Sequence, residues 1–132
     1  RSRILGVQLY LYDIEGFLQW GYNFYNTQHS TALVDPYSCT DGGDAFPAGD
    51  PYLVYPGRDG MPEESIRLMT TCEALFDLRA LRLLEALRGR AFVDALLHEG
   101  LAYRITFTQY PRGEAWLLDM RRRVNGALRA AL

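Results

Sequence analysis

The chain of 132 residues is long enough for one domain with its own core and too short for two ordinary domains. An apolar content of 48% is normal for a globular domain and argues against bulk disorder. The formal net charge of −2 implies no basic face for nucleic acid, and no apolar run reaches the ~18 residues that cross a bilayer. We therefore expect neither nucleic acid nor a membrane as a partner.

The first predicted element is a short helix over residues 3–12, followed by a turn at residues 13–16. Residues 17–24 are apolar almost throughout, which predicts a strand covered on both faces, as in a parallel sheet inside a shell of helices. Residues 26–50 are rich in glycine, proline and aspartate, which predicts a long loop without a regular element. Loops of this length in a compact domain are usually functional or disordered.

A short strand is predicted over residues 51–55. A turn follows at residues 58–63, and residues 62–64 suit the N-terminus of a helix. A long amphipathic helix is predicted over residues 65–88, with Gly89 ending it and with an apolar face of Leu68, Cys72, Leu75, Leu78, Leu81, Leu84 and Leu87. Two further helices are predicted over residues 91–98 and 111–132, the last with Trp116, Leu117, Met120, Val124 and Leu128 on one face. The order predicts an α/β segment. Because one strand and its helix cannot bury both faces of the strand, we expect that neighbouring strands are missing and that the chain closes a larger α/β structure.

Trp20, Tyr22, Asn23 and Tyr25 stand toward the end of the predicted strand, where barrel enzymes place their active sites. Aromatic rings offer an apolar face to a pyranose, and neighbouring amides and acids bind its hydroxyls. These residues fit a sugar-binding platform, and ordinary core aromatics are the alternative. A buried amide at Asn23 would need hydrogen-bond partners, which favours the platform.

The aspartates of the predicted loop, Asp41, Asp44 and Asp50, alternate with glycines as in a calcium loop, but the spacing does not match an EF-hand. We expect them to cap turns or to meet a substrate hydroxyl, with Asp44 and Asp50 as candidates for binding. The sequence has no phosphate loop and no dinucleotide fingerprint, so we expect no metal and no cofactor. Its two cysteines have no ligand-like spacing, which predicts free thiols and favours a reducing compartment such as the cytoplasm.

Three charged side chains of the long helix are interpreted as structural. We expect Arg67 to support the preceding loop, beside Tyr55, by pairing with Asp50 or with a backbone carbonyl. Glu73 and Asp77 lie one turn apart, midway along the helix, and are interpreted as salt-bridge partners of Arg79 or of neighbouring arginines, with a paired-carboxylate site as the alternative.

Three segments carry a resemblance to a known family. They are ILGVQLYLYDIEGFLQWGYNFYN at residues 4–26, DPYSCTDGGDAFPAGDPYLVYPG at residues 35–57, and the helix that begins with SIRL. Together they resemble the C-terminal end of a DUF4091 domain, the catalytic domain of glycoside hydrolase family 123 and its relatives. The motifs GFLQWGYNFY and GDPYLVYPG in this order are specific, and the match is dense up to Gly89 and looser in the tail.

The resemblance implies that residues 1–132 are a single partial domain, the C-terminal fragment of a (β/α)8 TIM-type barrel. Residues 1–60 would supply a helix, the last barrel strand and the active-site loop, residues 61–89 the last barrel helix, and residues 90–132 a helical tail. The resemblance also implies retaining, substrate-assisted hydrolysis of β-linked N-acetylhexosaminides, notably of N-acetylgalactosamine. It leaves open whether the parent protein is secreted.

In that family an adjacent Asp-Glu pair does the catalytic work, and this sequence contains no Asp-Glu dipeptide. The resemblance therefore implies a catalytic pair upstream of Arg1, in a missing N-terminal part of the same barrel, and an inactive fragment without catalytic residues. What carries over is the substrate-facing wall of Trp20, Tyr22 and Asn23 with the loop of residues 41–50. A non-catalytic carbohydrate-binding or structural remnant of the same fold is the alternative, and the upstream codons would separate the two.

Overall fold

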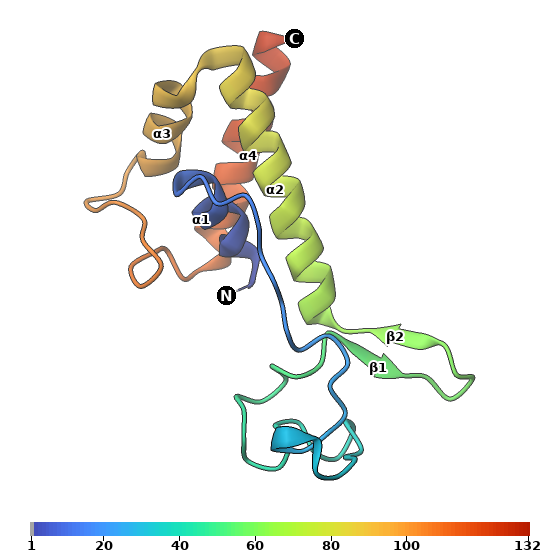
Figure 1. Cartoon of the computed structure of the whole chain (residues 1–132). Coiled ribbons are helices and arrows are strands. Elements are labelled where there is room, and N and C mark those ends of the chain that lie inside the picture. Colours follow the sequence, from blue (N-terminus) through green and yellow to red (C-terminus); the bar gives the residue numbers. More distant parts are fainter. Residues whose placement is uncertain (1) are drawn as a thin grey trace. The chain divides into compact units, whose positions relative to one another are not determined.

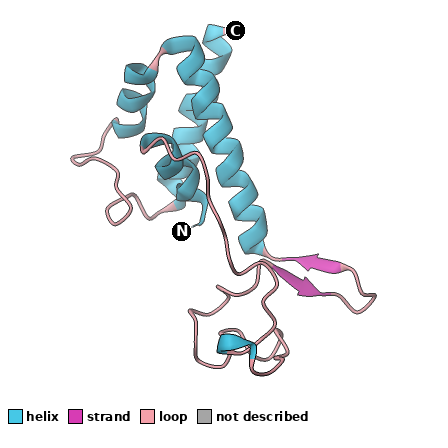
Figure 2. Cartoon of the chain, viewed as in Figure 1, coloured by secondary structure: helices cyan, strands magenta, loops and turns pink. Residues whose placement is uncertain are grey.

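The computed structural model describes residues 2–132, which combine helices with one small antiparallel sheet (Figures 1 and 2). Its elements in chain order are the 3-10 helix η1 (Ser2–Ile4), α1 (Leu5–Leu11), the 3-10 helix η2 (Gln28–Ser30), β1 (Val54–Pro56), β2 (Pro62–Glu64), α2 (Ile66–Arg88), α3 (Arg90–His98) and α4 (Glu114–Ala131). None of the helices among these residues is long and apolar enough to cross a membrane.

The contacts group the chain into two compact units. The helical unit contains the described residues up to Glu15 together with Thr71–Leu132, and the loop unit contains Gly16–Thr70. The predicted helices all form, with ends shifted by up to three residues, and the predicted loop of residues 26–50 contains only the 3-10 turn η2. The result is the mixed α/β segment that the sequence predicts.

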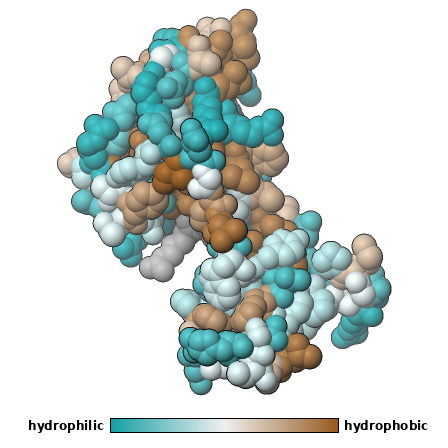
Figure 3. Space-filling model, in the orientation of Figure 1, coloured by the Kyte–Doolittle hydropathy of each residue, from teal (hydrophilic) through white to brown (hydrophobic). Residues whose placement is uncertain are grey.

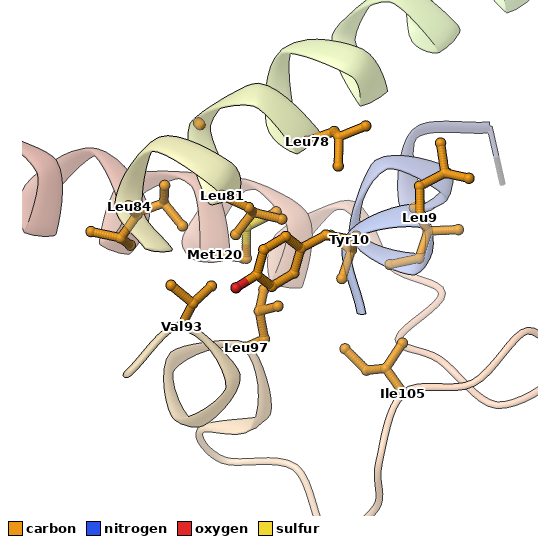
Figure 4. Close-up of a cluster of buried hydrophobic side chains, with 13 residues drawn as sticks. Leu9, Tyr10, Leu78, Leu81, Leu84, Val93, Leu97, Ile105 and Met120 are labelled. Atoms are coloured by element: carbon orange, nitrogen blue, oxygen red, sulfur yellow. The ribbon is translucent and has the colours of Figure 1, made fainter. Parts of the chain in front are cut away.

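The helical unit has a core of apolar side chains from α1, α2, α3 and α4. Figure 4 shows Tyr10 of α1 pointing between Leu81 of α2, Leu97 of α3 and Met120 of α4. These four side chains are at most 2% exposed. The remaining buried members of the core are Ile4, Val7, Leu9, Leu78, Ala80, Leu84, Val93, Ile105 and Val124. Burial of several large side chains, each worth about 1.5–3 kcal/mol, makes this cluster the main source of stability in the unit.

Two further contacts fix α1 in the helical unit. Gly6 lies so close to α2 that a Cβ atom there would be 1.9 Å from the main-chain oxygen of Ala74. At the other end of α1, the Nη2 atom of Arg90 donates to the main-chain oxygens of Tyr10 and Leu11, each at 2.9 Å. Arg90 thus satisfies carbonyls that a helix C-terminus leaves without partners, and its cation suits the negative end of the helix dipole.

The buried face of α2 differs in part from the predicted one. Leu78, Leu81 and Leu84 are buried as predicted, whereas Leu75 and Leu87 are exposed. Ala74 and Asp77 also lie on the buried face of α2. Because their side chains are small or polar, the spacing of the leucines alone does not define this face.

The run of residues 17–24, predicted to be a strand, forms no strand in the structure. It is irregular and pairs with the segment before β1 through an isolated bridge between Asn23 and Tyr52 and through the hydrogen bond from Leu53 N to Gly21 O, at 3.1 Å. A parallel strand needs a hydrogen-bonding neighbour of the same direction, and the described residues offer this run only an antiparallel one.

The only sheet in the described part of the chain is the hairpin of β1 and β2. Val54 pairs with Glu64, Tyr55 with Glu63, and Pro56 with Pro62. The predicted strand at residues 51–55 therefore exists only at its end, and β2 occupies residues that the sequence assigns to a turn and to the start of the long helix.

Candidate functional site

Trp20 belongs to a cluster of three aromatic rings in the loop unit. Its ring centroid lies 5.6 Å from that of Phe24 and 4.7 Å from that of Phe46. Trp20 is nevertheless 45% exposed. An aromatic ring that two others hold in place and that still faces solvent presents an apolar surface suited to stacking on a sugar ring.

The main chain at Trp20 is held by a close approach of two segments. A Cβ atom on Gly21 would lie 2.0 Å from the main-chain oxygen of Asp50, so only glycine fits there. The same oxygen accepts a hydrogen bond from Nε2 of Gln19 at 3.3 Å. Asp50, a predicted binding residue, is half-buried and joins this contact through its backbone.

Tyr22 and Asn23 are both exposed, and Tyr22 keeps 49% of its surface accessible. The expectation of a buried amide at Asn23 is therefore wrong, because the run forms no covered strand. Because the Asn23 amide is exposed, its position has no desolvation cost, and the position alone does not indicate a function. It remains free to bind a hydroxyl, since its amide donates and accepts hydrogen bonds.

Four tyrosines form a row of ring contacts through the loop unit. The centroids of Tyr25 and Tyr52 are 5.7 Å apart, those of Tyr52 and Tyr55 5.8 Å, and those of Tyr55 and Tyr37 5.2 Å. The hydroxyl of Tyr25 donates to the Val54 main-chain oxygen at 2.8 Å. Tyr25, predicted to bind substrate, thus contributes to the packing of the unit, whereas Tyr37 at the end of the row is 56% exposed.

Arg67 holds this row in place. Its Nε and Nη2 atoms donate to the Tyr52 main-chain oxygen at 3.0 and 2.9 Å, and Nη2 also donates to the Tyr55 hydroxyl at 2.7 Å. Of the two partners expected for Arg67, the structure contains the backbone carbonyl. The guanidinium also lies against Gly49, where a Cβ atom would be 2.7 Å from Nη1. Gly49 has a φ of +80°, so both space and backbone conformation favour glycine.

The aspartates of the loop differ in their contacts. Oδ1 of Asp41 accepts hydrogen bonds from the backbone amides of Gly43 and Asp44, each at 3.1 Å. The amides of Asp44 and Gly43 lower the pKa of the Asp41 carboxyl. Asp41 therefore caps a turn, as expected for one of these residues. Asp44 is exposed, with a φ of +61°.

No group of three or more His, Cys, Asp or Glu side chains among residues 2–132 is placed to hold a metal ion. Cys39 and Cys72 are free thiols, as predicted from their spacing.

Glu73 and Asp77 form salt bridges with arginines, as the sequence predicts, but their partners are Arg3 and Arg121 and not the predicted Arg79. Asp77 is 1% exposed and accepts from Nε of Arg3 at 2.9 Å and from Nη1 of Arg121 at 2.8 Å. Glu73 lies 3.7 Å from Arg3. The partners come from η1 and α4, which sequence spacing along one helix does not reveal. A carboxylate enclosed by two guanidinium groups is a structural ion pair with no exposed lone pair for catalysis.

Neither Phe46, which packs on Trp20, nor Tyr37, at the end of the row of tyrosines, is predicted from the sequence. Tyr37 follows an aspartate turn in which Asp35 Oδ1 accepts from the Tyr37 amide at 3.1 Å. An aspartate turn that places a tyrosine within a long loop can be recognised in the sequence alone. The contact of Tyr37 with Glu63 cannot be recognised there.

Residues 1–84 match the family model described as the catalytic domain of glycoside hydrolase 123. The match includes α1, the whole loop unit and most of α2, so it contains every predicted substrate-binding residue. No curated protein matches the chain. Because the match covers more than half of the 132 residues and includes both specific motifs, the chain belongs to the family of the glycoside hydrolase 123 catalytic domain.

Proposed function

We propose that the chain is the closing segment of a glycoside hydrolase barrel and supplies part of the wall that binds the substrate. The observation that carries this proposal is the half-exposed ring of Trp20, packed on Phe46 and Phe24 within the family match. Exposed Tyr22 and Asn23 follow after Gly21 and add a second ring and an amide. This combination of fixed apolar surface and hydrogen-bonding groups suits a pyranose.

The proposed barrel is supported by apolar surface in each unit, taken separately. In the loop unit, Phe17 and Leu18 are 49% and 86% exposed, in the run that the sequence predicts to be a strand covered on both faces. In the helical unit, Phe76, Leu83 and Leu87 are exposed at spacings of seven and four, which form a second apolar stripe on α2. Figure 3 shows apolar residues reaching the surface in both units. Such surfaces mark faces that another part of a domain covers.

We further propose that residues 17–24 pair with neighbouring barrel strands in the whole domain, that residues 61–89 are its last helix and that residues 90–132 are a tail. The substrate would be a β-linked N-acetylhexosaminide of the N-acetylgalactosamine type. Its acetamido oxygen would attack the anomeric carbon, and an Asp-Glu pair in the preceding part of the barrel would orient the acetamide and transfer the proton. The present chain would contribute binding and no catalytic residue.

The test joins the chain to the preceding coding sequence of its gene and measures hydrolysis of nitrophenyl β-N-acetylgalactosaminide. We expect the complete protein to be active and the 132-residue chain alone to be inactive. Trp20→Ala should lower kcat/KM by about 10–100-fold, the loss of one well-placed contact. Asn23→Ala should also lower it, without loss of stability, because that side chain is exposed.

As a matched control, Phe107→Ala removes an aromatic ring with 50% exposure from the helical unit and should leave kcat/KM unchanged. An active protein in which Trp20→Ala leaves kcat/KM unchanged would overturn the proposed substrate-binding role of Trp20.

The absence of an Asp-Glu dipeptide favours a second candidate, a non-catalytic carbohydrate-binding or structural remnant of the same fold. The preceding codons separate the two proposals. An Asp-Glu pair at the end of a predicted strand supports the enzyme. A complete protein that binds N-acetylgalactosamine without hydrolysing its nitrophenyl glycoside supports the remnant.

A further inference from the structure

We propose a second saccharide subsite in the loop unit, the hairpin site, formed by Tyr37, Arg58 and Glu63. It would bind a neutral pyranose ring with free hydroxyls. This choice of ligand rests on the proposed function, but the site shares no residue with the Trp20 cluster, so the two can be tested apart.

The hairpin site is a concave surface made by adjoining cavities. One of about 600 Å³ is lined by Tyr37, Arg58 and Glu63. A second of about 400 Å³ lies along Arg58, Met61 and Glu63, and a third of about 370 Å³ lies between Tyr37, Thr40 and Glu63. Glu63 borders all three. Volumes of this size are in the range of sites for small ligands.

The walls of the hairpin site are fixed by backbone contacts. In the turn between β1 and β2, Gly57 N donates to Met61 O at 2.8 Å, and Oδ1 of Asp59 accepts from Met61 N at 3.0 Å. A Cβ atom on Gly57 would lie 2.4 Å from the same Met61 oxygen, so the turn has no room for another residue. Such a rigid hairpin loses little conformational freedom when a ligand binds, which favours affinity.

Tyr37 is held against the hairpin at both its ring and its hydroxyl. The ring centroid lies 5.2 Å from that of Tyr55, whose hydroxyl accepts a hydrogen bond from Arg67. The Tyr37 hydroxyl donates to Oε2 of Glu63 at 2.9 Å and lies 3.2 Å from Pro56 O. Because it donates to a carboxylate, its pKa is raised, and it stays protonated at neutral pH. More than half of Tyr37 nevertheless faces solvent.

These groups complement a neutral sugar better than a charged ligand. Glu63 accepts hydrogen bonds, Arg58 donates them through a planar guanidinium, and Tyr37 offers a ring for the apolar face of a pyranose. A cation would meet Arg58. An anion would meet Glu63 and the nearby acids Asp59 and Glu64, which line the adjoining cavities. A polyhydroxylated neutral ring uses donor and acceptor together.

The test titrates the 132-residue chain with galactose and, as a charged counterpart of the same stereochemistry, with galacturonic acid. Backbone amide shifts in NMR spectra report on Tyr37, on the hairpin and on residues 20–24. We expect galactose to shift the amides of Tyr37 and of residues 57–64 with a Kd on the order of millimolar, as for a single sugar unit. Galacturonic acid should bind the hairpin several-fold more weakly because of the acidic lining.

Glu63→Gln keeps the shape of the side chain and should weaken galactose binding by about tenfold, the effect of removing a charged acceptor. Glu15→Gln makes the same charge change at an exposed position of the helical unit and should have no effect. Tyr37→Phe should weaken binding less than Glu63→Gln, because the ring remains. Galactose that leaves the hairpin amides unshifted, or that binds Glu63→Gln as tightly as the unmodified chain, would overturn the proposal.

A Trp20→Ala variant distinguishes this proposal from the proposed wall. The hairpin site predicts that galactose still shifts residues 57–64 in that variant. If Trp20→Ala abolishes the galactose-induced shifts of residues 57–64 and leaves the rest of the amide spectrum unchanged, the two sites are one. That result would also overturn the hairpin site. If galactose shifts the hairpin amides and Trp20→Ala has no effect on hydrolysis, the hairpin site is supported and the proposed substrate-binding role of Trp20 is refuted.

Discussion

The guanidinium of Arg67 donates two hydrogen bonds to the main-chain oxygen of Tyr52, from Nε at 3.0 Å and from Nη2 at 2.9 Å. A pair of charge-assisted hydrogen bonds to one backbone carbonyl is stronger than a neutral hydrogen bond and fixes the direction of the main chain there. It places the segment that pairs with Gly21 and Asn23, so the geometry of the candidate site depends on it.

Arg67→Lys should loosen the loop unit while keeping the charge, because an ammonium group cannot reproduce the planar fork. We expect a loss of about 1–2 kcal/mol, seen as amide hydrogen exchange at Leu53 that is roughly tenfold faster. Arg79→Lys makes the same change at an exposed position of α2 and should alter exchange by less than about twofold. Equal exchange rates in the two variants would contradict the supporting role of Arg67.

Asp77→Asn should destabilise the helical unit strongly, because it leaves Arg3 and Arg121 facing a neutral group in a buried place. Breaking a buried ion pair in this way typically costs about 3–5 kcal/mol. Glu73→Gln is the matched control, since Glu73 is 53% exposed on its side chain and lies 3.7 Å from Arg3. Its loss should be at most about 1 kcal/mol. Urea denaturation followed by helical circular dichroism measures both, and similar midpoints would refute the argument.

Two glycines of the helical unit should respond to alanine in opposite directions. Gly6→Ala brings a Cβ atom against the Ala74 main-chain oxygen, which cannot move without shifting α2, so we expect a loss of about 3 kcal/mol or more. Gly126 lies within α4, and the space around its Cβ position is open. Gly126→Ala should stabilise the unit by about 0.5–1 kcal/mol, because alanine is the better helix former. Thermal unfolding compares them, and a stable Gly6→Ala variant would contradict the close approach of α1 and α2.

The turn capped by Asp41 should loosen in acid. The backbone amides of Asp44 and Gly43 lower the pKa of Asp41 in the folded chain, so its ionised form favours the fold. This contribution is fully present above the ordinary carboxyl pKa of about 4 and is lost as the pH falls through the lowered folded value. The amide shifts of Gly43 and Asp44 in NMR spectra should follow that titration. Asp41→Asn should abolish it, and a titration that survives this change would assign the effect to another carboxyl.

The helical unit was predictable because local apolar spacing determines it. Met120 and Val124 are buried on the face of α4 that their spacing indicates. The run of residues 17–24 was not, because strand formation depends on a hydrogen-bonding neighbour that composition cannot supply. The aromatic contact of Trp20 with Phe46 and the bond of Tyr37 to Glu63 likewise join residues 26 apart in sequence, through a loop with no periodic signal.

The two tryptophans of the chain fall in different units, Trp20 beside Phe46 in the loop unit and Trp116 half-buried against the helical core. Each unit thus carries its own intrinsic fluorophore. Two single-tryptophan variants would report separately on denaturation, and coincident or separate emission transitions would reveal whether the units melt as one cooperative body or as two.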